Sequence, residues 1–217
     1  MINRRFPVFA CLFLTACSCR PPQPVFLPAA MLGKVDVVTY CQAHGDAGCD
    51  SEILQQAIKP PGQGGISSGV LVRLLEEVPV YRLWNGPEAP LNDYGGTNRI
   101  GAWWSADKPA GKVFDYRRQN AICQEWNTLA WAVKCTLKPG TLVAVGPTQS
   151  ANCRTGDHFA ANPTLQLYVD NLAARFVSCP KVAADKAARD FPVNPDEVLL
   201  EKTATPSADG VPVQEAP

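Results

Sequence analysis

Cysteine content is the sequence feature that most narrows how this chain can fold. Of its nine cysteines, six lie in the body of the chain: Cys41, Cys49, Cys123, Cys135, Cys153 and Cys179. An even set of cysteines in an exported protein is typical of a disulfide framework. The short spacing favours a bond between Cys41 and Cys49 and leaves the pairing of the other four open. A metal site is the rival interpretation, but there is no CxxC motif and only His44 and His158 could assist. We therefore predict three disulfides and no metal site.

The N-terminal residues indicate export. Arg4 and Arg5 precede a short apolar run, Phe6 to Leu14, as in a secretory signal. A membrane-spanning helix needs about 20 apolar residues, so this run is too short to be one. The sequence Leu-Thr-Ala-Cys that ends at Cys17 resembles a lipoprotein cleavage box, which implies cleavage before Cys17 and lipidation of that residue. The alternative is an ordinary signal peptide followed by a chance cysteine.

Composition divides the chain into four parts. We expect a lipoprotein signal peptide at 1–16, a Pro-rich tether at 17–33, one globular domain at 34–180 and a disordered tail at 181–217. The resemblance to lipoproteins of Gram-negative bacteria implies that Ser18, after the expected lipidation site, favours the outer membrane, so the membrane would be a partner through the anchor. Acidic and basic residues balance at 20 each, and this balance gives no indication of nucleic-acid binding. Nothing in the sequence points to a particular protein partner.

Periodicity within the domain predicts a mixed, strand-rich α+β fold with short helices. We expect strands at 34–40, 78–86 and 165–169, helices at 50–59, 70–77 and 113–120, and a β-hairpin that joins 127–137 to 141–145. Asp50 is the expected N-cap of the first helix.

The segment from Val78 to Ser105 carries the chemistry that stands out. Val80, Arg82 and Trp84 alternate with Tyr81 and Leu83, so Arg82 shares the apolar face of Val80 and Trp84. A buried guanidinium is costly unless it meets an anion, such as a carboxylate or a phosphate. Two tryptophans then stand beside Ser105, and aromatic faces with a nearby hydroxyl suit a flat heterocycle. The alternative is that Arg82 makes a structural ion pair and the tryptophans belong to the core.

The order of these motifs resembles the ADP-ribosyltransferase fold, and most closely the NAD-consuming toxin domains of bacteria. The resemblance rests on Tyr81-Arg82, on Trp104-Ser105 and on Pro139-Gly140-Thr141, and it covers about 78–171. It implies a split sheet, with NAD as a substrate rather than as a bound cofactor.

The resemblance also implies roles for individual residues. Arg82 would hold the phosphates, Trp103 or Trp104 would stack on nicotinamide, Ser105 would position the ribose, and Tyr81 would contact the substrate. Transferases of this fold usually place a glutamate on a late strand, whereas this chain offers Gln166 there, with Gln149 as the other candidate. Because a glutamine is neutral, hydrolysis of NAD is more plausible than transfer of ADP-ribose to a protein.

Two functions from different classes follow. The first is an NAD-consuming enzyme of the NAD glycohydrolase or mono-ADP-ribosyltransferase type, tethered to the bacterial envelope. The second is a non-enzymatic envelope lipoprotein whose disulfide-stapled domain acts as a binding or scaffold module. Convergence of Arg82, a Trp-Ser pair and Gln166 on one cleft would favour the first.

Lipidation can be tested by a single substitution. In Cys17→Ser the acceptor thiol is gone, so the protein should accumulate as an unprocessed or soluble form. Membrane fractionation and electrophoretic mobility would report the change. Normal fractionation with unchanged mobility would show that Cys17 is not the anchor.

Overall fold

The computed structural model describes residues 26–87, 99–170, 175–179 and 190–192. The helices are a short 3-10 turn η1 (Ala29–Met31), α1 (Glu52–Ala57) and α2 (Val113–Gln119). The strands are β1 (Val35–Cys41), β2 (Gly69–Leu74), β3 (Val78–Trp84), β4 (Trp103–Trp104), β5 (Trp131–Leu137), β6 (Leu142–Thr148), β7 (Ala151–Asn152), β8 (His158–Phe159), β9 (Asn162–Tyr168), β10 (Phe176–Ser178) and β11 (Asp190–Pro192). The signal peptide, most of the tether and most of the predicted tail lie outside the described residues, although β11 falls within that tail.

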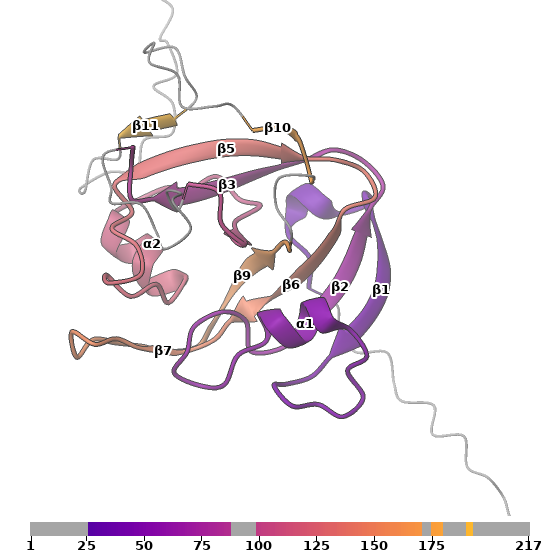
Figure 1. Cartoon of the computed structure of the whole chain (residues 1–217), viewed down its shortest axis with the longest axis horizontal. Helices are drawn as coiled ribbons and strands as arrows, with labels where there is room; N and C mark the ends of the chain where they lie inside the picture. Colours follow the sequence, from indigo (N-terminus) through magenta and orange to yellow (C-terminus); the bar gives the residue numbers. More distant parts are fainter. Residues whose placement is uncertain (1–25, 88–98, 171–174, 180–189, 193–217) are drawn as a thin grey trace, which may run out of the picture.

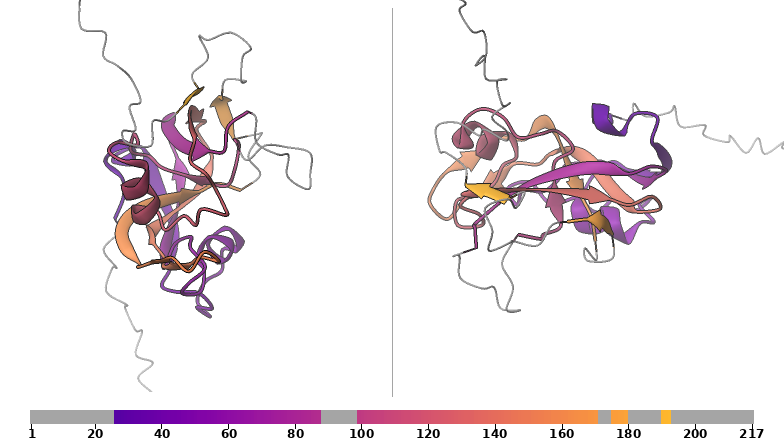
Figure 2. Two further views of the ribbon diagram at one scale, coloured as in Figure 1. Left: turned by 90° about the vertical axis from the view of Figure 1, so that its left-hand side faces the viewer. Right: turned by 90° about the horizontal axis from the view of Figure 1, so that it is seen from above.

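Two antiparallel sheets form the body of the molecule (Figure 1). The larger has the strand order β1-β2-β6-β9-β4. In the second sheet, β5 pairs with β3 along one edge and with β10 and β11 along the other. A separate two-stranded hairpin, β7–β8, projects at the same end of the molecule as α2 (Figures 1 and 2).

The main apolar core lies between the two sheets and follows from the period-two alternation of their strands. From β2 and β3, it receives Val70, Val72, Leu74, Val78, Val80 and Trp84. Intervening residues pack on the outer faces: Leu71 lies in a cluster with α1, and Leu83 in a cluster with α2. Arg82 has the same parity as Val80 and Trp84, so its side chain starts from the face that the two sheets share.

Helix α1 begins one residue later than the sequence predicted. Ser51, not Asp50, is the N-cap, and its hydroxyl accepts a hydrogen bond from Leu54 N at 3.3 Å. The helix ends before Pro60 and Pro61, which cannot continue it. α2 agrees with the prediction for 113–120 to within one residue.

The predicted helix at 70–77 is wrong, because β2 occupies Gly69–Leu74. Five of its six residues are buried, since it lies inside the larger sheet with α1 on one face and the second sheet on the other. Burial on both faces removes the alternation of apolar and polar residues that normally reveals a strand. The remaining run of apolar residues resembles a buried helix.

The predicted hairpin of 127–137 with 141–145 is also wrong in its pairing. Both strands exist, but β5 pairs with β3, and β6 pairs with β2 and β9. The turn between them carries the chain from one sheet to the other. Gly140 donates its N–H to Leu74 O, and Lys138 donates its N–H to Arg175 O. The turn thus bonds to other parts of the chain, and the strands on either side of it lie in different sheets.

Three disulfides join Cys41 to Cys49, Cys123 to Cys153 and Cys135 to Cys179. The predicted oxidation of all six cysteines and the Cys41–Cys49 pair are confirmed. Disulfides of this density are typical of proteins that mature in an oxidising, extracytoplasmic compartment. No helix in the described part of the chain is long and apolar enough to cross a membrane. The strand-rich α+β class is likewise confirmed.

The disulfides should differ in their contribution to stability, because they close loops of different length. Cys135 and Cys179 are 44 residues apart, and Cys41 and Cys49 are eight apart. Chain-entropy arguments give about 4 kcal/mol for the first and about 2.5 kcal/mol for the second. Denaturant unfolding of the paired serine variants should therefore show the larger loss for Cys135→Ser/Cys179→Ser. Equal losses, or free thiols in peptide maps of the unreduced protein, would contradict this assignment.

Candidate functional site

A cavity of about 330 Å³ lies between the two sheets, beside the C-terminal end of α2. Its walls include Arg82 from β3, Trp103 from β4 and Gln166 from β9, together with Lys59, Trp126 and Asn127 from loops. A smaller void of about 30 Å³ continues it inward and is lined by Tyr116 and Trp104 as well. Three residues that the sequence singled out, spread over more than 80 positions, therefore meet in one place.

Arg82 is held at the inner wall. Its Nη1 donates a hydrogen bond to Trp103 O at 2.7 Å, which links the second sheet to the first. Burial lowers the pKa of Arg82 to about 10, and the nearby Tyr116 hydroxyl acts in the opposite direction. Burial also raises the pKa of Tyr116 to about 12. At neutral pH, therefore, a charged guanidinium lies beside a neutral phenol.

Gly101 makes room for Arg82. A Cβ at this position would lie 2.5 Å from the central carbon of the guanidinium and 2.5 Å from Nη2. Such distances are far below van der Waals contact, so any larger residue must displace the guanidinium. The absence of a side chain at Gly101 is thus part of the site.

Gln166 is buried, and its amide orientation is fixed by its neighbours. Nε2 donates to Asn120 O at 3.0 Å and to Thr148 Oγ1 at 2.9 Å, and Gly65 O lies 3.5 Å away. Backbone carbonyls only accept hydrogen bonds, so the NH₂ group must face them. Thr148 Oγ1 in turn donates to Thr164 O at 2.9 Å and accepts from Gln166. The carbonyl oxygen of Gln166 is left as the group that can meet a ligand.

Two tryptophans and two glycines shape the outer walls. A Cβ on Gly65 would lie 3.1 Å from the Trp103 ring, and a Cβ on Gly64 would lie 2.9 Å from the Trp126 ring. Both glycines have positive φ angles, +73° for Gly65 and +70° for Gly64, which favour glycine. The loop therefore packs closely under both rings. The Trp103 ring also contacts Tyr168 edge-on, at 5.0 Å between centroids.

The other predicted site residues lie elsewhere. Ser105 exchanges backbone hydrogen bonds with Tyr81, and its hydroxyl donates to Asp107 O at 2.8 Å. The side chain of Tyr81 packs on the α2 side of β3, opposite Arg82. Trp104 is buried in the main core and donates its Nε1 hydrogen to Gly101 O at 2.6 Å. Trp103, rather than Trp104, is thus the tryptophan of β4 that lines the cavity of about 330 Å³.

Gln149, the other glutamine candidate, and Glu125 have structural roles. Gln149 donates to Lys59 O at 3.1 Å and accepts from Ser150 N at 2.9 Å. Glu125 accepts a hydrogen bond from Arg154 N at 2.6 Å, which lowers the pKa of its carboxyl group. Glu125 lies with Cys123 and Cys153 in a group of potential metal ligands, but both cysteines form a disulfide and their sulfurs are not available.

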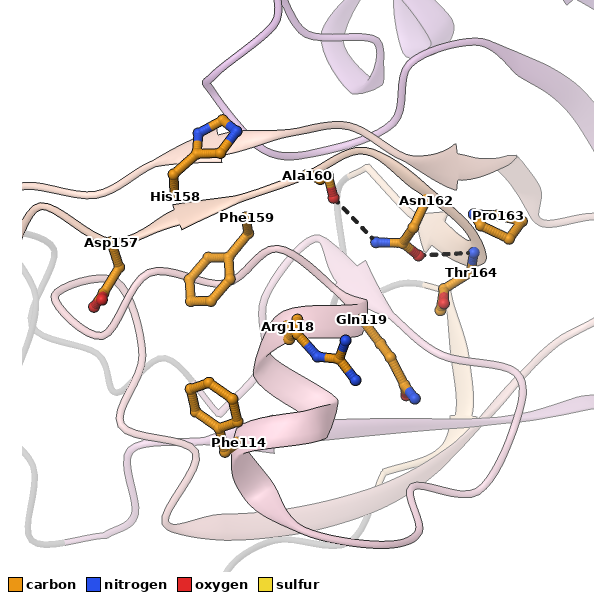
Figure 3. A pocket seen from close by; sticks show the side chains of 10 residues that line it. All are labelled: Phe114, Arg118, Gln119, Asp157, His158, Phe159, Ala160, Asn162, Pro163 and Thr164. Carbon is orange, nitrogen blue, oxygen red and sulfur yellow. Dashed lines mark hydrogen bonds between the residues drawn. The ribbon is translucent and has the colours of Figure 1, made fainter.

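A larger cavity of about 570 Å³ lies outside this site, between α2 and the β8–β9 segment (Figure 3). Phe114, Arg118 and Gln119 approach it from α2, while Phe159 points toward α2 and His158 points away. Several of its polar groups bond to neighbours: Asn162 to Ala160 O and Thr164 N, and His158 to Asn152 at 2.6 Å. None of the site residues predicted from the sequence lines it, so we place the site in the smaller cavity.

Several lining residues were missed in the sequence. Lys59 stands before two prolines, Trp126 lies outside every predicted element, and the sequence predicts Asn127 only as the first residue of the strand at 127–137. Asn127 bridges two segments, since its Nδ2 donates to Leu83 O at 2.8 Å and its Oδ1 accepts from Leu129 N at 2.9 Å. An aromatic residue beside an amide outside any regular element was the one available signal, and it is weak.

No protein-family model matches this chain, and no curated protein and no solved structure matches it either. The geometry of the cavity is therefore the basis for inferring a function.

The role of Gly101 can be tested directly. In Gly101→Ala the methyl group should displace the flexible end of Arg82 while the fold persists, because the clash involves no backbone atom of Arg82. An arginine-selective dicarbonyl reagent should then modify Arg82 faster than in the wild type, as measured by mass spectrometry.

Gly48→Ala is the matched control, because its Cβ would meet its nearest atom, Asp46 Oδ1, at 3.4 Å. Unchanged reactivity of Arg82 in Gly101→Ala would show that the glycine is not needed to seat the guanidinium.

Proposed function

We propose that this chain is an NAD glycohydrolase carried on a lipid-anchored protein of the bacterial envelope. The observation that supports it is the convergence of Arg82, Trp103 and Gln166 on one cavity, although Ser105, which was expected beside them, does not line it. These are the residue types that such a reaction requires: a cation for the phosphates, an aromatic wall for nicotinamide and a polar group for the ribose. We also propose that the two sheets correspond to the split sheet of ADP-ribosyltransferases.

The size and lining of the cavity fit this substrate. Ligand sites of about 300–1,000 Å³ with few, well-placed polar groups are typical of small-molecule recognition. Arg82 offers a planar set of donors that can grip two phosphate oxygens at once. Trp103 gives an aromatic surface against which the nicotinamide ring can pack. The cavity accepts the nicotinamide end of NAD, and the adenosine end extends toward its mouth.

The reaction breaks the bond between the ribose carbon C1′ and the nicotinamide nitrogen. The bonding electron pair stays on that nitrogen and neutralises the pyridinium, while positive charge develops on the ribose. A water oxygen then bonds to C1′ and releases a proton, which gives ADP-ribose and free nicotinamide. The carbonyl oxygen of Gln166 is placed to accept a hydrogen bond from a ribose hydroxyl or from this water, and its negative end faces the developing cation.

Hydrogen bonding at Gln166 favours hydrolysis over transfer. A carboxylate in its place would bring a second oxygen toward Asn120 O and Gly65 O, where only a donor is satisfied. The position is therefore built for an amide rather than for the glutamate that transferases use. A neutral amide can orient water but activates a protein acceptor poorly.

The lipid anchor at Cys17 and the outer membrane belong to the same proposal. The oxidising setting that the disulfides indicate agrees with export, and the sequence before Cys17 supplies the cleavage box. NAD is scarce outside cells, so the substrate would be met in another cell or released from one.

Activity should depend on Arg82 and Gln166. Arg82→Lys retains a positive charge but loses the two-pronged grip, and we expect turnover of NAD to fall by about 100-fold. Gln166→Ala should reduce kcat more than KM, because its carbonyl oxygen acts on the developing ribose cation. Release of nicotinamide from NAD, followed by chromatography, measures both.

Arg73→Lys is the matched control, because Arg73 is an exposed residue of β2. Melting temperatures should accompany each assay, since a lost fold imitates a lost site. A well-folded wild-type protein that releases no nicotinamide would refute the enzymatic proposal and leave the binding module.

A further inference from the structure

We propose that Lys59 is a second anion-binding residue and that the cavity selects a substrate with a diphosphate group. This inference rests on the proposed function for its location, but it concerns recognition rather than catalysis. Neither the sequence patterns nor the resemblance pointed to Lys59.

The charge of the cavity is the first observation. Lys59 and Arg82 both line it, and among the described residues that line it there is no aspartate or glutamate. An anion that binds in this cavity is attracted by a guanidinium and by an ammonium group. The cavity is thus suited to a ligand that carries more than one negative charge.

The second observation is how firmly Lys59 is placed. Its backbone N–H donates to Ile66 O at 3.0 Å, and its carbonyl accepts from Gln149 Nε2 at 3.1 Å. The residue is partly buried, while its ammonium group has no hydrogen bond or ion pair to any residue that the structure describes. Lysines in globular proteins usually lie fully in solvent, so a fixed stem on the wall of a cavity is unusual.

Gly65 connects Lys59 to the aromatic wall. A Cβ on Gly65 would lie 2.8 Å from Cγ of Lys59 and 3.1 Å from the Trp103 ring. The aliphatic stem of Lys59 and the ring of Trp103 therefore pack against the same glycine. A ligand whose flat ring lies on Trp103 would reach Lys59 with a group attached a short distance from the ring. In a dinucleotide, that group is the diphosphate.

Arg82 and Lys59 would each bind one phosphate of the diphosphate. Arg82 is held by Trp103 O at the inner wall, whereas the chain of Lys59 enters from the loop that follows α1. A diphosphate between them meets one planar cation and one point charge, so both of its phosphates are neutralised. A nucleoside has no group for either cation, and the site should discriminate against it.

Binding measurements on the full-length protein in detergent test this proposal. Isothermal titration of ADP-ribose and of adenosine should show tighter binding of ADP-ribose to the wild type. Lys59→Gln should weaken ADP-ribose binding by about tenfold or more, because it removes a charged hydrogen bond, and should leave adenosine unchanged. Lys59→Arg should restore most of the affinity.

Lys138→Gln is the matched control, because Lys138 is exposed in the turn after β5. Equal affinity of wild type and Lys59→Gln for ADP-ribose would overturn the inference, even if the wild type hydrolyses NAD. Wild-type protein that binds ADP-ribose through Lys59 but releases no nicotinamide would sustain the inference and overturn the proposed enzyme. The two failures are therefore distinguishable.

Discussion

The site depends on the place where the two sheets are joined. Tyr81 of β3 and Ser105, next to β4, exchange backbone hydrogen bonds of 2.8 and 2.9 Å. One residue away, Arg82 reaches across to Trp103 O at 2.7 Å. The junction fixes the distance between the strands that carry the cation and the aromatic wall. The cavity lies beside this junction, and most of its lining residues are not members of the main core.

The opposite wall is held by less regular means. Ala121 and Leu129 adopt left-handed backbone angles, with φ of 46° and 61°, which cost about 1–2 kcal/mol each for residues other than glycine. Arg117 donates to Ile122 O, and the disulfide Cys123–Cys153 ties the same segment to the β7–β8 hairpin. The stretch that carries Trp126 and Asn127 keeps its shape through these bonds. Formation of this disulfide therefore affects the wall of the cavity as well as the core.

The buried polar groups of the cavity are held in fixed orientations. Gln166 satisfies backbone carbonyls from two loops, and the same bonds point its carbonyl oxygen away from them. Gly101 leaves space for one guanidinium and for nothing larger. The contacts that hold Gln166 and Arg82 in place also determine which of their polar atoms face the cavity. A substitution at Gln166 or Gly101 should therefore change both the packing and the polar groups that line the cavity.

Local patterns determined much of this protein in advance. The alternation in β3 placed Arg82 on the core face, and the six cysteines indicated three disulfides, although they left the pairing of four of them open. Both depend on residues close in sequence or on composition alone, and so did the prediction of α2. The sequence could name Arg82 and Gln166 as candidates, but it could not choose between Trp103 and Trp104.

Tertiary structure decided the rest, because the deciding contacts join residues far apart in the chain. The segment at 70–77 contains a strand that is covered on both faces. β5 and β6 do not pair with each other, because β5 pairs with β3 in one sheet and β6 pairs with β2 in the other. Lys59 lies at the cavity because it contacts Ile66, Gly65 and Gln149, and no periodicity in the sequence predicts these contacts. The sequence by itself therefore determined which residues are capable of chemistry, and strand pairing across the molecule determined which of them meet.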